Sequence, residues 1–111
     1  MGLFQRFANL FSQKGRDDEL LLKGMEHAKA GRPQRAVEIY DTLVKSKSSS
    51  DTLRARALFN RALAHSSLKN DLQAIADLNE VLTLPNVPEN VRNSARDQLK
   101  RVHKRSDKPT G

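Results

Sequence analysis

The chain repeats its own pattern of residue types at a spacing of 38 positions, which limits its fold more than any other feature. Small residues align with small ones and large apolar residues with large ones, through two periodic segments and the turn between them. The aligned pairs are Leu20 with Leu58, Gly24 with Ala62, His27 with His65, Ala36 with Ala74, Val37 with Ile75, Tyr40 with Leu78, Leu43 with Val81, and Val44 with Leu82. We therefore expect two copies of one structural unit.

Helical periodicity runs through both copies and the segments that flank them. Apolar residues recur at the three- and four-residue spacing of one helix face in six segments, at about 3–13, 17–30, 33–44, 51–68, 72–82 and 88–104. The string Lys14-Gly15-Arg16 is expected to end the first segment. Asp17 and Asp18 would then begin the second, where the helix dipole favours negative charge. The fold class predicted is all-α, and 111 residues suffice for one modest core.

The order of residue sizes within each copy resembles the tetratricopeptide repeat (TPR) family. The first copy has Leu20, Gly24, His27, Gly31 at the turn, Ala36, Tyr40 and Leu43, and the second has Leu58, Ala62, His65, Ala74, Leu78 and Val81. The small residues would let two helices of a pair approach closely. The resemblance implies antiparallel helix pairs stacked as a short right-handed TPR-like solenoid. The family's usual spacing is about 34 residues, so Ser48–Asp51 reads as an extension between units.

The resemblance and the charge pattern together suggest a division of the chain. We expect an amphipathic N-terminal helix over residues 1–16, a TPR-like domain over 17–104 and a disordered tail over 105–111. Within the domain, repeat 1 would cover about 17–47, repeat 2 about 51–86 and a capping helix about 88–104. The net charge of +7 lies at the two ends, since residues 17–87 are neutral as a whole.

In TPR folds the first helix of each pair lines a concave groove, and the resemblance implies which residues would do so here. They are Leu21, Met25, Ala28 and Lys29 in the first unit, and Arg56, Phe59, Leu63, Ser66 and Ser67 in the second. The middle of this set is apolar, which favours a hydrophobic or helical peptide segment over an acidic peptide terminus. The alternative is that the apolar members pack against one another or against the cap.

The N-terminal segment concentrates three of the four Phe residues of the chain. Its apolar residues are Leu3, Phe4, Phe7, Leu10 and Phe11. An isolated helix this short is marginally stable in water, so its apolar face needs a surface. Three surfaces remain open: the repeats themselves, a membrane surface with Arg6, Lys14 and Arg16 near anionic headgroups, and another protein or a second copy of the chain.

The function predicted is a non-catalytic protein–protein interaction module, an adaptor that binds a hydrophobic or helical segment. No nucleophile motif or phosphate-binding loop is present, and the three His do not have metal-ligand spacing, so we expect no enzyme activity, cofactor, metal or small-molecule substrate. The alternatives are a peripheral membrane protein anchored by its first helix and, less favoured, a nucleic-acid-binding protein with a basic final helix. The absence of Cys favours a cytoplasmic location, and the N-terminal segment leaves a membrane-peripheral one open. Homo-oligomerisation is a further option.

Overall fold

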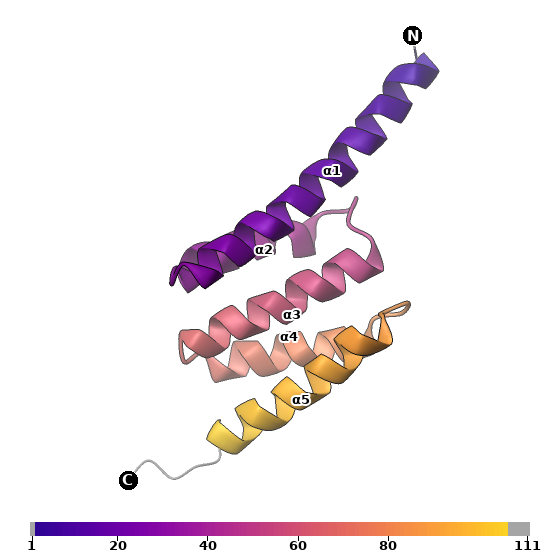
Figure 1. The fold of residues 1–111 in the computed structure, drawn as a ribbon. Helices are drawn as coiled ribbons and strands as arrows, with labels where there is room; N and C mark the ends of the chain where they lie inside the picture. The colour runs from indigo at the N-terminus through magenta and orange to yellow at the C-terminus, as the bar shows by residue number, and fades with distance from the viewer. Residues whose placement is uncertain (1, 107–111) are drawn as a thin grey trace.

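The computed structural model describes the backbone of residues 2–106 and the side chains of residues 15–106. This part of the chain forms helices and no strand, which confirms the predicted all-α class (Figure 1). The helices are α1 (Gly2–Lys29), α2 (Pro33–Lys45), α3 (Asp51–Ser67), α4 (Asp71–Thr83) and α5 (Glu89–Ser106).

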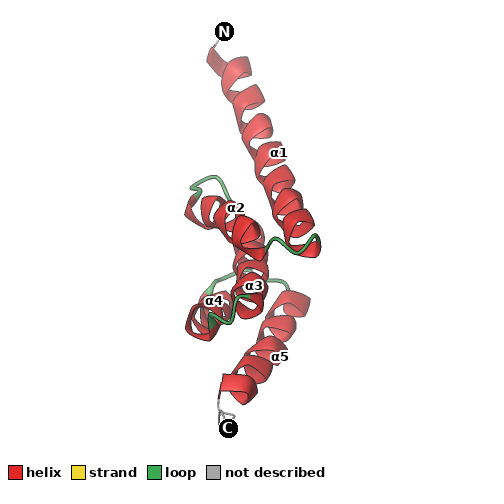
Figure 2. Ribbon diagram, turned by 90° about the vertical axis from the view of Figure 1, so that its left-hand side faces the viewer, coloured by secondary structure: helices red, strands yellow, loops and turns green. Residues whose placement is uncertain are grey.

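The helices stack in chain order and form two layers. Each helix packs against the next along the chain, and α3 also contacts α1 and α5. In Figure 2, α2 and α4 lie on one side of the stack, while α1 and α5 lie on the other. Because α3 also contacts α1 and α5, the first helices of the units form one layer, and α2 and α4 form the other.

The spacing of 38 residues governs the helix boundaries as well as the residue types. Helix α2 begins at 33 and ends at 45, and α4 begins at 71 and ends at 83; α3 and α5 begin at 51 and 89. Backbone conformation repeats too, because Gly31 and Lys69 both adopt a positive φ, of 80° and 64°, at the turn inside each pair. Helix α5 is thus the first helix of a third unit, a correspondence that the sequence comparison missed.

Each of the two connections between successive units is held by an arginine side chain. Arg54, in the first turns of α3, donates from Nε to the carbonyl of Val44 (3.3 Å) and from Nη2 to that of Ser46 (3.0 Å). Arg92, in α5, donates from Nη1 to the carbonyl of Leu82 (3.1 Å). These donors satisfy carbonyls at the end of α2 and of α4, which have no partner within their own helix.

Helix α5 closes the stack with a solvated face. Its Val91, Ala95 and Val102 are buried against the preceding unit. Where α3 presents Leu58 and Ala62 to its partner helix, the corresponding positions of α5 are Arg96 and Lys100, both exposed. A helix that packed on α5 as α4 packs on α3 would have to bury these charges.

Two parts of the helix prediction are wrong. Lys14-Gly15-Arg16 does not end a helix, because α1 runs unbroken over 28 residues. One glycine lowers helix stability by only about 1 kcal/mol, too little to interrupt a helix that packs along α2. The predicted tail at 105–111 begins too early, since α5 extends to Ser106. The remainder of that tail, residues 107–111, lies outside the described residues.

The acidic run after Gly15 has a different role from the one predicted. Asp17 lies in the interior of α1 and is buried, and Oγ of Ser48 donates a hydrogen bond of 2.7 Å to its Oδ2. Ser48 belongs to the connection between α2 and α3, where the sequence showed an extension. This carboxylate therefore holds the inter-unit connection against α1 and does not begin a helix.

The core consists of two clusters that share α3. The first joins α1, α2 and α3 through Leu21, Ala36, Val37, Tyr40, Leu43, Leu53, Ala57 and Ala64. The second joins α3, α4 and α5 through Ala55, Leu58, Ala62, Ala74, Leu78, Val81, Val87, Val91, Ala95 and Val102. Because α3 is buried on both faces, it is the central element, and both helix pairs depend on its position.

Tyr40 provides a test of the first cluster. Its ring is fully buried, and its hydroxyl has no hydrogen-bond partner among the described residues. Burial raises the pKa of Tyr40 to about 12. A desolvated hydroxyl without a partner is unfavourable, so Tyr40→Phe is expected to raise the free energy of unfolding at neutral pH by about 1 kcal/mol.

The pH dependence of the two proteins should also differ. Between pH 10 and 12 an unfolded tyrosine loses its proton while the folded one keeps it, so the wild type should lose about 3 kcal/mol of stability that Tyr40→Phe retains. Urea unfolding at several alkaline pH values measures this loss, and tyrosinate absorbance reports Tyr40 alone because the chain has one Tyr. Equal pH slopes for both proteins would contradict the assignment.

Candidate functional site

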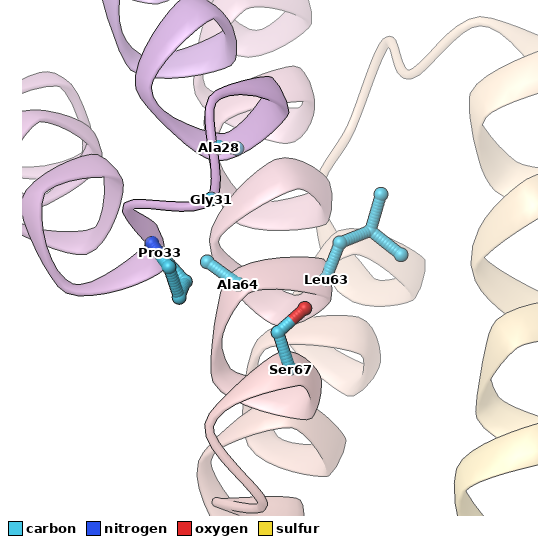
Figure 3. A pocket seen from close by; sticks show the side chains of 6 residues that line it. All are labelled: Ala28, Gly31, Pro33, Leu63, Ala64 and Ser67. Carbon is cyan, nitrogen blue, oxygen red and sulfur yellow. The ribbon is translucent and has the colours of Figure 1, made fainter.

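Two adjoining hollows lie between α1 and α3 and form what we call the α1–α3 groove. One, of about 360 Å³, is lined by Leu22, Met25, Glu26, Ala28, Lys29 and Asn60. The other, of about 310 Å³, is lined by Ala28, Gly31, Pro33, Leu63, Ala64 and Ser67 (Figure 3). Ala28 borders both, so the two hollows adjoin on the layer of first helices.

Large apolar side chains are exposed in this groove. The exposed fractions of Leu22 and Met25 are 59% and 43%. Positions 22 and 25 share one face of α1, while Leu21 and Gly24 on the neighbouring face are buried against α2. Lone exposed apolar residues are common, but two neighbours bordering a hollow make a surface suited to an apolar ligand.

The other wall of the groove comes from α3 and the start of α2. Figure 3 shows Ala64 pointing toward Pro33, while the Leu63 side chain points away from both. Ala64 is buried and Leu63 is half-buried. The small side chain lets α2 and α3 approach, and the large one remains partly available at the groove surface.

The structure brings together only part of the predicted groove set. Met25, Lys29, Leu63 and Ser67 line the groove, and so does Ala28. The other predicted residues lie elsewhere. Leu21 is buried in the first core cluster, and half-buried Phe59 packs against the second. Arg56 is exposed on α3 and borders neither hollow.

The α5 side of α3 is polar and basic where the α1 side is apolar. Ser66 is buried and accepts a hydrogen bond of 2.8 Å from Nη2 of Arg105. The same guanidinium pairs with the carboxylate of Asp71 at the start of α4. Arg101 is exposed one turn earlier on α5. The Ser66 hydroxyl is therefore engaged by Arg105 within the fold. The exposed apolar surface of the first helices lies on the other side of α3, facing α1.

A charged network behind the groove fixes α3 relative to both second helices. Arg61 donates from Nε and Nη2 to the two carboxylate oxygens of Asp77, at 2.9 and 2.7 Å, and from Nη1 to Oδ1 of Asp41 at 2.8 Å. The hydrogen bond with Asp77 raises the pKa of Arg61 above its ordinary value, so the guanidinium remains charged. Asp41 belongs to α2 and Asp77 to α4. Arg61 thus joins the two units.

Six residues that line the groove were absent from the predicted set: Leu22, Glu26, Gly31, Pro33, Asn60 and Ala64. Leu22 shares a face with Met25, which is a signal present in the sequence. That signal is weak beside the run Leu20-Leu21-Leu22, in which the sequence alone does not decide which Leu faces outward. Asn60 occupies the position in α3 that corresponds to Leu22 in α1, at the spacing of 38 residues.

Two of the three histidines occupy matching positions in α1 and α3. Nδ1 of His27 accepts a hydrogen bond of 2.9 Å from Nε of Arg32, at the turn into α2. His65 is half-buried at the matching position of α3. In the part of the chain that the structure describes, no group of three or more His, Asp or Glu could hold a metal ion. None of the described helices has the length and apolar character to cross a bilayer.

Comparison with known proteins assigns the second helix pair to a family. Residues 55–87 match the tetratricopeptide repeat, a stretch that covers most of α3, all of α4 and the connection to α5. The second helix pair thus matches a tetratricopeptide repeat, which confirms the predicted family for this part of the chain. Comparison with curated proteins and with solved structures found no match.

Proposed function

We propose that the chain binds an amphipathic helical segment of a protein in the α1–α3 groove. A tetratricopeptide repeat indicates a protein–protein interaction module. The observation that supports this particular ligand is the pair of adjoining hollows beside the exposed Leu22 and Met25, with Leu63 on the opposite wall. These residues lie on helices, so the surface is present before a ligand binds.

The chemistry of the groove suits a helix whose apolar residues recur at three- and four-residue spacing. Such a helix places successive anchors on one face, one for each hollow. Burying one anchor of the size of Leu or Phe contributes about 1.5–3 kcal/mol. Glu26, Lys29, Asn60 and Ser67 also line the hollows and supply polar groups that can pair with the polar flanks of the ligand.

The test is a selection of helical peptides from a random library on the purified chain. We expect the selected peptides to have apolar residues at positions i, i+3 or i+4, and i+7. The double variant Leu22→Asp with Met25→Asp should bind them about 100-fold more weakly, the loss expected from two apolar contacts of about 1.5 kcal/mol each.

A matched control is Leu72→Asp, because Leu72 is 81% exposed on α4 and borders neither hollow. It should leave peptide affinity within about twofold, a change within the usual effect of a distant surface substitution. Circular dichroism should show equal helicity for all three proteins. Equal affinity of the double variant and the wild type would refute the proposal.

A further inference from the structure

We propose that two copies of this chain pair through α1 in antiparallel fashion. The N-terminal part of each α1, residues 2–14, would lie in the α1–α3 groove of the other copy. This inference rests on the proposed function, because it names an occupant for the groove.

The first observation is the length of α1. By the spacing of the repeat, the residue that corresponds to the start of α3 at Asp51 is Gln13, so residues 2–12 extend beyond the repeat unit. Figure 1 shows this part of α1 continuing past α2, away from the other helices. At about 1.5 Å per residue, residues 2–14 span about 20 Å, and the part of α1 that lines the groove, from Leu22 to Lys29, spans about 12 Å. The extension is therefore long enough to cover the groove.

The second observation is the register of α1. Positions 4, 11, 18 and 25 of one unbroken helix share a side, and positions 7, 14, 21 and 28 lie beside them. The side that holds Phe4, Phe7 and Phe11 in the extension is therefore the side that holds Met25 in the groove. Between these two apolar ends, the stripe contains a basic position, Lys14, and an acidic one, Asp18.

Charge complementarity sets the direction of pairing. In an antiparallel pair, position 14 of each copy lies opposite position 18 of the other, so Lys14 meets Asp18 twice, and positions 3–11 lie opposite positions 21–29. A parallel pair would place Lys14 opposite Lys14 and Asp18 opposite Asp18, which is repulsive. It would also leave Leu22 and Met25 opposite their own copies instead of the Phe-rich extension.

The charge of the two halves of α1 agrees with this direction. Residues 1–16 have a net charge of +3 and no acidic residue, whereas residues 17–29 have a net charge of −2. Asp18, Glu19 and Glu26 are exposed on the groove half of α1. A twofold axis through the middle of the helix pair brings the basic half of each copy to the acidic half of the other, an interface of the closed type.

Sedimentation equilibrium of the full chain tests the proposal by charge exchange. The wild type should form a dimer of twice its 12.5 kDa mass. Lys14→Asp should raise the dimer dissociation constant at least tenfold, because two Asp residues then face two Asp residues. Adding Asp18→Lys to that variant should restore the dissociation constant to within about threefold of the wild type, since the opposite charges meet again.

Three results would overturn the proposal: a wild type that stays monomeric at about 100 µM, a Lys14→Asp variant that dimerises as well as the wild type, or a double variant without recovery. Flotation of a monomeric wild type with vesicles of phosphatidylglycerol and phosphatidylcholine would assign the extension to a lipid surface instead.

The proposed function is tested separately, by peptide binding to the Lys14→Asp variant. If selected peptides bind this variant through Leu22 and Met25, the proposed function is supported, even where the wild type forms no dimer. If the wild type forms a dimer but the Lys14→Asp variant binds no selected peptide, the proposed function is refuted.

Discussion

Replacing Arg61 with Leu is expected to lower the free energy of unfolding by about 3 kcal/mol, measured by urea denaturation at neutral pH. The substitution leaves the carboxylate of Asp77, only 5% exposed, without its bidentate partner. Removing one member of a buried ion pair generally costs about 3–5 kcal/mol. The lower end applies here because the Arg61 side chain is 17% exposed and that of its second partner, Asp41, is 42% exposed.

Two controls separate this effect from the loss of any surface arginine. Arg35 pairs with Glu38 at an exposed site, so Arg35→Leu should change the free energy of unfolding by less than about 0.5 kcal/mol. The double variant Arg61→Leu with Asp77→Leu removes both charges and should recover most of the lost stability. If Arg61→Leu changed the free energy of unfolding as little as Arg35→Leu, the network would not join the two units as described.

The same substitution at two glycines of α1 should have opposite effects. A Cβ atom at Gly24 would lie 2.4 Å from Cε1 of Tyr40, whose ring is fully buried, whereas a Cβ atom at Gly15 meets nothing within 4 Å. Overpacking of this kind costs about 1–3 kcal/mol or more, and alanine returns about 1 kcal/mol of helix propensity. Gly24→Ala should therefore lower the free energy of unfolding by about 2 kcal/mol, and Gly15→Ala should raise it by up to about 1 kcal/mol.

Thermal and urea unfolding of the two single variants measure this difference directly. Each variant is the control for the other, because both place one methyl group in the interior of the same helix. Destabilisation by Gly15→Ala of the size expected for Gly24→Ala would show that α1 is interrupted at that residue. Stabilisation by both substitutions would show that Tyr40 can withdraw from α1.

The sequence predicted the helix pairs well because local periodicity and residue size determine them. Ala36, Tyr40, Leu58 and Leu78, all named from the repeat, are fully buried in the two core clusters. Small residues mark the places where helices approach closely, as the contact of Gly24 with Tyr40 shows. These features depend on neighbours within a turn or two of helix, which a single sequence displays.

Features that depend on distant residues were not predictable in the same way. The hydrogen bond from Ser48 to Asp17 joins residues 31 positions apart, and the acidic run therefore appeared to begin a helix. The two hollows lie between α1 and α3, the helices named for a groove from the sequence, but the residues that line them depend on how far α1 is rotated about its own axis. That rotation buries Leu21 and exposes Leu22. It follows from packing against α2 and α3, which the pattern of apolar residues does not record.

The arginines that hold the inter-unit connections have a consequence for how the chain melts. Stacked repeats unfold in stages when each unit is stable alone and the junctions are weak. Here Arg54 binds carbonyls at the end of α2 while its own helix contributes to both core clusters, and Arg92 binds the end of α4 from α5. When the helix that follows a pair unfolds, the pair also loses the hydrogen bonds to its last carbonyls. We therefore expect the stack to unfold in one cooperative transition.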